Sequence, residues 1–178
     1  MLRKFSYPFL LLLIWGGVVF AQTPPSIPPR TVQVIEPTVP LRFGSFTAPL
    51  SSSGSVTVSA GGSITPGGDV YLMGGTVQQG MFEFKLLPGR TVIIRYPVTA
   101  TISGIGSAGG SMTLTDLTFS IEGGVIEQSG SGYIQFQSNV GSNAVHRIYM
   151  GGKLLVGNTI INPPGDYNDN VQLTIESF

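Results

Sequence analysis

The sequence predicts an all-β domain, either a β-sandwich or a β-barrel. Short runs rich in Val, Ile, Thr, Phe and Tyr alternate with Gly, Ser and Asn along most of the chain. Residues 55–59, 133–137 and 171–176 alternate between apolar and polar side chains, so one face of each strand is expected to be buried, with Ile134 and Phe136 pointing inward. No eleven-residue window combines the apolar spacing of an amphipathic helix with freedom from Gly and Pro.

Residues 1–21 have the pattern of a secretory signal peptide. Arg3 and Lys4 precede an apolar run over residues 9–20, and Ala21 ends the segment at a suitable cleavage site. The alternative is a membrane anchor, but the apolar run is shorter than the roughly 20 residues that span a bilayer. We therefore expect an exported protein, located in the periplasm, at the cell surface or outside the cell, with no membrane span after cleavage.

Residues 22–40 form a Pro-rich N-terminal arm that is expected to be largely extended. Residues 31–35 are its one strand-like island. Val32 and Val34 are the candidate assembly residues, because an extended arm can add a strand to the sheet edge of a neighbouring subunit. Pairing within its own domain and a simple spacer role are the alternatives.

Residues 41–178 are expected to form a single domain. The predicted strands are 41–46, 55–59, 69–73, 81–86, 91–96, 98–103, 111–121 (one strand or two), 132–137, 145–150, 153–156 and 171–176. Gly-Gly pairs separate several of these runs, and glycine permits the positive φ that tight hairpins need. The pair Gly151-Gly152, between two apolar runs, predicts the clearest hairpin.

Composition excludes several classes of function. The chain contains no Cys, so it has no disulfide, zinc-thiolate site or cysteine nucleophile. Only 10% of residues are charged and the formal net charge is zero, which argues against a nucleic-acid interface. A single His, His146, argues against a histidine metal cluster. No cofactor is predicted.

Three motifs follow one another over residues 41–178. The first is Leu-Arg-Phe-Gly at 41–44, the second is Pro-Gly-Arg-Thr-Val-Ile-Ile at 88–94, and the last is Pro-Gly-Asp-Tyr-Asn-Asp-Asn-Val-Gln-Leu-Thr-Ile at 164–175. Their order resembles that of an exported bacterial family catalogued as domain of unknown function 4402. The ending also resembles the tails of spore coat protein U and pilin-like families. These resemblances imply an immunoglobulin-like sandwich with a structural or filament-type role and no enzyme activity.

Two motifs hint at catalysis but lack their usual context. Residues 104–109 match G-x-G-x-x-G, but strand-like sequence follows where a dinucleotide site needs a helix. His146 has no nucleophile-elbow motif to accompany it. We interpret the first as a hairpin and His146 as a surface residue of a strand, on the face opposite Val145 and Arg147.

Two groups of acidic residues are candidate sites. Asp166 to Asn170 offer oxygen ligands at alternate positions, but Val171 and Ser177 stand where a calcium loop needs Gly and Glu. A polar turn with at most weak calcium binding is the favoured interpretation. Glu122 and Glu127 are interpreted as solvated turn carboxylates rather than as a glycosidase pair.

The sequence thus predicts a non-catalytic envelope subunit whose partners are proteins, through self-association or contact with other envelope proteins. An adhesin or carbohydrate-binding module is the alternative, with Tyr71 and Tyr167 as the aromatic residues nearest to loops. An envelope hydrolase using His146 is the third hypothesis. No catalytic, cofactor-binding or metal-binding residue is assigned.

Overall fold

The computed structural model describes residues 23–105, 109–139 and 144–178, and every regular element in those ranges is a β-strand. In chain order they are β1 (Val32–Ile35), β2 (Arg42–Thr47), β3 (Gly54–Val58), β4 (Ile64–Gly68), β5 (Tyr71–Gln78), β6 (Gly80–Lys85), β7 (Thr91–Arg95), β8 (Ala100–Gly104), β9 (Ser111–Glu122), β10 (Gly124–Gly130), β11 (Tyr133–Ser138), β12 (Val145–Val156), β13 (Tyr167–Asn168) and β14 (Leu173–Ser177). The predicted signal peptide lies outside the described residues. Across these ranges, no helix long and apolar enough to cross a membrane is present.

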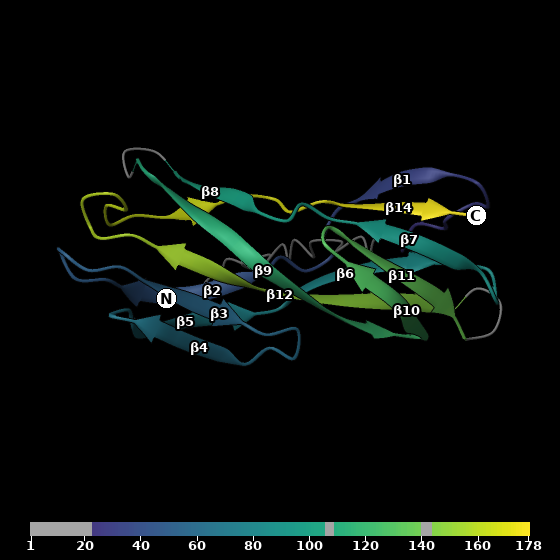
Figure 1. Cartoon of the computed structure of the whole chain (residues 1–178), viewed down its shortest axis with the longest axis horizontal. Helices are drawn as coiled ribbons and strands as arrows, with labels where there is room; N and C mark the ends of the chain where they lie inside the picture. The colour runs from purple at the N-terminus through teal and green to yellow at the C-terminus, as the bar shows by residue number, and fades with distance from the viewer. Residues whose placement is uncertain (1–22, 106–108, 140–143) are drawn as a thin grey trace, which may run out of the picture.

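The strands form three sheets, and all of their pairings are antiparallel (Figure 1). A five-stranded sheet has the order β1-β14-β7-β11-β10. A seven-stranded sheet has the order β13-β8-β9-β12-β3-β4, with β6 also paired to β12. Strands β2 and β5 pair with each other. The long strands β9 and β12 run diagonally across the molecule, which is elongated (Figure 1).

The two larger sheets pack face to face as a sandwich. Phe84 on β6 and Phe136 on β11 belong to different sheets, and their rings meet edge to face with centroids 6.2 Å apart. The inward position predicted for Ile134 and Phe136 is confirmed, since both are buried. The buried apolar residues that make up the single core cluster are Ile27, Ile35, Val56, Val70, Phe82, Phe84, Leu86, Val92, Ile94, Met112, Leu114, Ile134, Phe136, Ile148, Met150, Leu154, Val156, Val171, Leu173 and Ile175.

The predicted hairpin at Gly151-Gly152 is wrong, because β12 runs through both glycines without turning. One edge of β12 pairs with β6 up to Met150 and with β3 from Gly152 onward. At this change of partner, a Cβ on Gly151 would fall within about 2.5 Å of the backbone at Ser59 and Ala60. The glycine is needed for a close approach of two backbones, a role that the sequence pattern does not distinguish from a turn.

Three strands of the structure are absent from the predicted set. β13 is a two-residue pairing, and β10 follows directly on β9 after Gly123, whose φ of 89° makes the turn. β4 contains Pro66, which usually argues against a strand. β4 is at the end of the sheet order, where the missing N–H of a proline does not interrupt a ladder.

Candidate functional site

The strand of the N-terminal arm pairs with the last strand of its own domain. β1 lies antiparallel to β14, with Val32 opposite Glu176 and Ile35 opposite Leu173. Ser177 binds the residue just before β1. Its N–H donates to the Thr31 carbonyl at 2.9 Å, and its hydroxyl accepts from the Thr31 N–H at 3.1 Å. Of the three roles open to the arm, pairing within the domain is the arrangement in this structure.

The two predicted assembly residues point away from the core. Val32 is 70% exposed and Val34 is 55% exposed, whereas Ile35 is buried and Ile27, earlier in the arm, is buried too. β1 is the end of its sheet order, so its outer backbone edge has no strand partner among the described residues. The arm therefore joins the core through isoleucines and presents valines at an open sheet edge. A role of Val32 and Val34 in assembly stays a prediction.

A cleft of about 900 Å³ lies between β2, the inner faces of β8, β9 and β12, and the segment around β13. Its apolar walls include Phe43, Phe46 and Ile102, and the polar side chains of Asp166 and Asn168 lie on its lining. Strand β2 forms one wall of the cleft, opposite residues of β8, β9 and β12.

The two tyrosines that are candidates for ligand binding are far from equivalent. Tyr167 lines the cleft and is half-buried, and its hydroxyl donates to the Pro163 carbonyl at 2.7 Å. Burial raises the pKa of Tyr167 above its ordinary value. Tyr71 begins β5 and is 63% exposed. Of the two, Tyr167 is the one placed in a recess.

The acidic segment at Asp166–Asn170 lies at the surface. Tyr167 and Asn168 pair with β8, and Asp169 accepts a hydrogen bond from the Asn170 N–H at 2.7 Å. Within ranges 23–105, 109–139 and 144–178, no three His, Cys, Asp or Glu side chains converge closely enough to hold a metal ion. The structure thus places these oxygens in a strand and a local turn.

His146 is not a surface residue, and that prediction is wrong. It is fully buried, because on this face of β12 the seven-stranded sheet packs against the five-stranded one. Its ring lies 5.5 Å from the ring of Phe84 and 5.2 Å from that of Phe136, between centroids. Its Nε2 lies 3.2 Å from the Ser138 hydroxyl, the only polar side chain it bonds among the described residues. Alternation placed His146 opposite Val145 and Arg147 correctly, but it did not show which face was covered.

The environment of His146 favours its neutral form. Burial lowers the pKa of the imidazole below its ordinary value, and the backbone of Gly123 offsets this only in part. Among the described residues, no carboxylate orients the ring, so the arrangement lacks the third group of a hydrolase triad. A Ser and a His that both face the core are instead a packed polar pair.

We expect His146 to make the fold sensitive to mild acid. Its pKa is lowered in the folded state, so the unfolded chain binds more protons below about pH 6.5 and the free energy of unfolding falls there as pH decreases. Urea unfolding of wild type and His146→Gln between about pH 7.5 and about pH 5.5 measures this directly. The decrease in the free energy of unfolding between these two pH values should be smaller in His146→Gln than in wild type. Equal losses in both proteins would show that another group is responsible.

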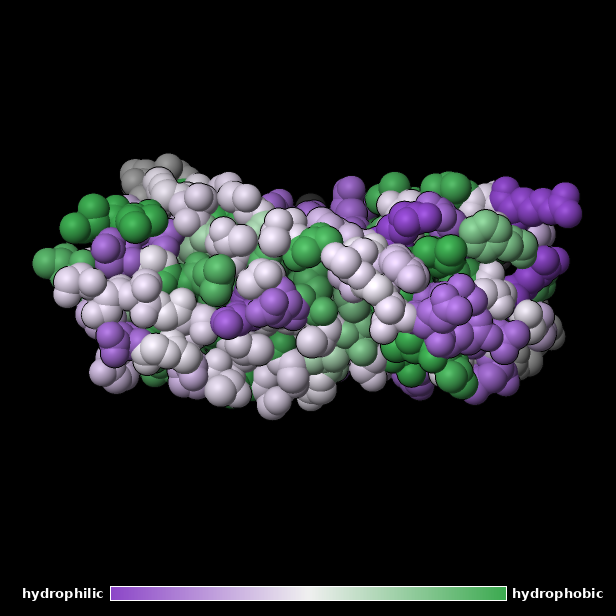
Figure 2. Space-filling view, in the orientation of Figure 1, coloured by the Kyte–Doolittle hydropathy of each residue, from purple (hydrophilic) through white to green (hydrophobic). Residues whose placement is uncertain are grey.

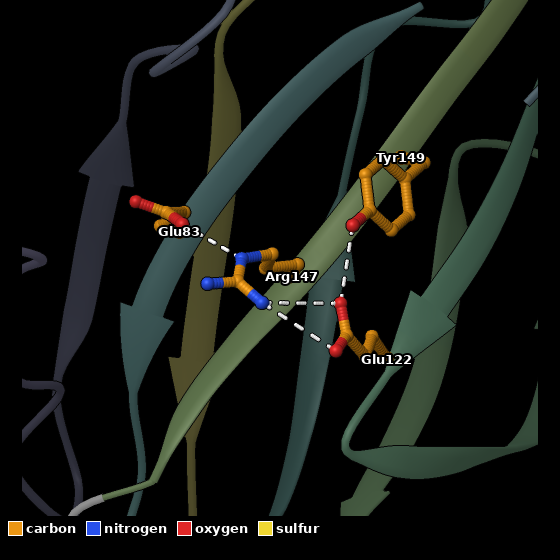
Figure 3. Close-up of polar contacts among 4 residues, drawn as sticks. All are labelled: Glu83, Glu122, Arg147 and Tyr149. Carbon is orange, nitrogen blue, oxygen red and sulfur yellow. Dashed lines mark hydrogen bonds and ion pairs between the residues drawn. The ribbon is translucent and has the colours of Figure 1, made fainter. Parts of the chain in front are cut away.

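An ionic cluster joins three strands on the outer face of the seven-stranded sheet (Figure 3). Arg147 on β12 donates through Nε to Glu83 on β6 at 2.8 Å and through Nη1 to Glu122 on β9 at 3.3 Å. The Tyr149 hydroxyl also donates to Glu122, at 3.1 Å. These contacts raise the pKa of Arg147, first through the bond to Glu83. Glu83 and Glu122 are the register partners of Arg147 on the two neighbouring strands.

The two carboxylates of this cluster should differ in importance. The Glu83 side chain is 16% exposed and that of Glu122 is 55% exposed, and ion pairs in open solvent contribute little to stability. We expect Glu83→Gln to lower the midpoint of thermal unfolding more than Glu122→Gln, and added salt to affect the Glu83 pair less. Differential scanning calorimetry of the two variants shows which of them has the lower midpoint of thermal unfolding. The reverse order would contradict this account of the cluster.

The remaining candidates do not form a catalytic site. Glu122 lies on β9, whereas Glu127 lies on β10 in the other sheet and accepts from the Gln135 amide at 2.7 Å. The G-x-G-x-x-G run connects β8 to β9, and residues 106–108 within it lie outside the described residues. Gly104 itself pairs with Tyr167 in the sheet. The strand predicted after this run is confirmed as β9.

Two features of the site were missed by sequence reasoning. The cleft depends on how β2 lies relative to β8, β9 and β12, for which the residue pattern carries no signal. The Arg147 cluster had a signal, because Glu83 and Arg147 both occur at outward positions of alternating strands. Pairing them required knowing that β6 and β12 are neighbours.

Comparison with known proteins places the chain in one family. No curated protein and no solved structure matches it. A family model described as "Domain of unknown function (DUF4402)" matches residues 34–176, which run from β1 to β14. Because the match covers nearly the whole sandwich, the chain belongs to the DUF4402 family.

Proposed function

We propose that the protein is an exported structural or filament-type subunit of the bacterial envelope without catalytic activity, and that its copies associate through the open edge of β1. One observation carries this proposal. β1 is bonded to β14 on one side, and its other edge has no strand partner among the residues described. The same strand exposes two valines, Val32 and Val34. The signal-peptide pattern supports export.

Within its four residues, the edge strand carries no charge, proline or bulge. Soluble proteins protect edge strands by keeping them very short, or with Lys, Pro, inward charges or a bulge. The four residues of β1 are Val-Gln-Val-Ile, with no charge, and the register with β14 is regular. The prolines flank the strand, at Pro29 and Pro37, rather than interrupting it. A second β1 can therefore add to this edge and continue the sheet, with main-chain hydrogen bonds and the valine side chains supplying the affinity.

The direct test places a charge on the edge and leaves the arm intact. Deleting the arm is unsuitable, since Ile27 and Ile35 belong to the core. Val34→Lys in the chain 22–178 should shift self-association to higher protein concentration in analytical ultracentrifugation. Val125→Lys is the matched control, because Val125 is 57% exposed on β10, the other edge strand of the same sheet. A wild type that stays monomeric, or equal effects of both variants, would contradict the proposal.

A carbohydrate-binding or adhesin role is the second candidate. The cleft beside Tyr167 supports it, because sugars are bound by an aromatic face together with polar groups and Asp166 and Asn168 lie on the same lining. Screening the chain 22–178 on a glycan array tests this role. Binding that Tyr167→Ala abolishes would favour it, whereas an array without signal would remove it.

A further inference from the structure

Strand register assigns the loops of the sandwich to two opposite ends. At one end, Gly54 on β3 pairs with Gly68 and Val156, Tyr167 pairs with Gly104, and Thr47 pairs with Tyr71. The described residues of the loops that leave the sheets here are 48–53, 69–70, 105, 109–110 and 157–166. We call this the acidic end. At the opposite end, Lys85 pairs with Val145 and Thr91 with Gln137, and the segments 23–31 and 86–90 lie there with the end of β14. We call this the basic end.

The loops of the acidic end carry two exposed carboxylates. Asp69 and Asp166 lie in these loops and are both exposed. None of the loop residues given above is Lys or Arg.

Large apolar side chains are exposed among those carboxylates. Leu50 is 71% exposed, Ile105 55%, Ile160 74% and Ile161 60%. The two loops that hold the isoleucines contact each other, since the Ile105 N–H donates to the Asp166 carbonyl at 2.8 Å. Figure 2 shows hydrophobic residues at the surface of this end, on the left of the view, beside hydrophilic ones.

The basic end has the opposite charge. Arg30 is exposed, Lys85 and Arg90 are half-buried, and the segments 23–31 and 86–90 contain no Asp or Glu. The glutamates on the strands nearest to it are paired with arginines: Glu176 with Arg95, and Glu83 and Glu122 with Arg147. Apolar side chains are exposed here as well, because Leu87 is 44% exposed and Phe178 60% exposed.

We propose that copies of this chain stack end to end, with the acidic end of one copy docked on the basic end of the next. This inference rests on the proposed structural role and adds a second contact, along the long axis of the molecule rather than across β1. Opposite charges face each other in this arrangement, and the exposed leucine, isoleucine and phenylalanine side chains supply the apolar area that charges alone do not. Stacking two acidic ends would instead bring carboxylates against carboxylates.

The geometry of such a contact determines what it builds. Two different surfaces of the same chain meet, so the contact is heterologous. Each added copy presents a fresh acidic end and a fresh basic end, and association continues unless the rotation between copies closes a ring. The elongated molecule therefore serves as the repeating unit of a filament. Edge pairing through β1 links such filaments side by side.

Charge reversal at each end tests the inference. We expect Asp69→Lys/Asp166→Lys and Arg30→Glu/Arg90→Glu each to weaken end-to-end association by on the order of tenfold or more at low salt. Mixing the two variants should restore association, because each intact end then meets its complement and the two reversed ends also match. Light scattering and negative-stain electron microscopy give the extent and the length of the assemblies.

The controls separate this contact from the edge of β1. Asp116→Lys/Glu127→Lys changes the same number of charges on β9 and β10, away from both ends and from β1, and should assemble as wild type. All variants carry an intact Val32 and Val34, so edge pairing remains available to them. If Val34→Lys dissolves the assemblies while both end variants and their mixture match wild type, the end contact is wrong and the structural role stands. If wild type never associates, both fail.

Salt dependence gives an independent outcome. Raising NaCl from about 10 mM to about 150 mM shortens the screening length from roughly 30 Å to roughly 8 Å. End-to-end association of wild type should weaken over this range, and the mixture of reversed variants should weaken in parallel. Association that is unaffected by salt, or a mixture that stays monomeric, would overturn the proposal.

Discussion

Replacing Gly151 with alanine is expected to destabilise the sandwich by about 3 kcal/mol, the upper end of the usual cost of overpacking. A Cβ at this position would lie within about 2.5 Å of the Val58 carbonyl oxygen, the Ser59 carbonyl carbon and the Ala60 nitrogen. All three are backbone atoms of the neighbouring strand and its turn, so they cannot move aside as a flexible side chain would. Chemical denaturation of the variant measures the loss.

Gly89→Asn is the matched control for that experiment. Gly89 has a φ of 68°, and nothing lies within 4 Å of the position that a Cβ would occupy. Asn tolerates this backbone conformation at a cost of below about 1 kcal/mol. If Gly151 were in a hairpin turn, the two substitutions would have similar effects. Similar effects would therefore contradict the continuous strand β12.

Ile35→Ala is expected to cost about 2–4 kcal/mol, because it empties part of a packed core. Ile35 is 4% exposed and pairs with Leu173, which is fully buried. This substitution tests whether the N-terminal arm is packed into the fold, because its Pro-rich composition alone predicts an extended tail. Equilibrium unfolding in urea measures the change in the free energy of unfolding.

Val34→Ala, one residue earlier, should cost below about 0.5 kcal/mol, since Val34 is 55% exposed. Ile35→Ala and Val34→Ala both shorten a β-branched residue on the same strand. A difference in their cost therefore reports the burial of Ile35 in the core and not the composition of the arm. A loss below about 1 kcal/mol for Ile35→Ala would mean that the arm is not part of the cooperative fold.

The all-β class and most strands could be predicted from the sequence because alternation is a local signal. The strands predicted at 55–59, 81–86 and 91–96 correspond to β3, β6 and β7 with ends shifted by one residue. The error at Gly151 has a different origin. A glycine pair permits a turn and also permits close backbone contact, and only the neighbouring strand decides between them.

The candidate site depends even more on tertiary contacts. Val32 and Val34 were identified because they alternate, and the structure exposes both. That their partner is β14 follows from sheet order, which no local pattern contains. His146 shows the same limit, because alternation assigned its face but not whether a second sheet covers that face. The separation of charge between the two ends became visible only once register had assigned each loop.

Self-association of the chain 22–178 is the property on which this account depends. Sedimentation velocity of wild type and Val34→Lys, over a wide range of protein concentration and at low salt, measures it in one experiment. We predict that the mass of wild type rises with concentration and that Val34→Lys needs markedly more protein to reach the same mass. A single monomeric species for both proteins at every concentration would contradict the structural role and leave the cleft beside Tyr167 as the place to look for function.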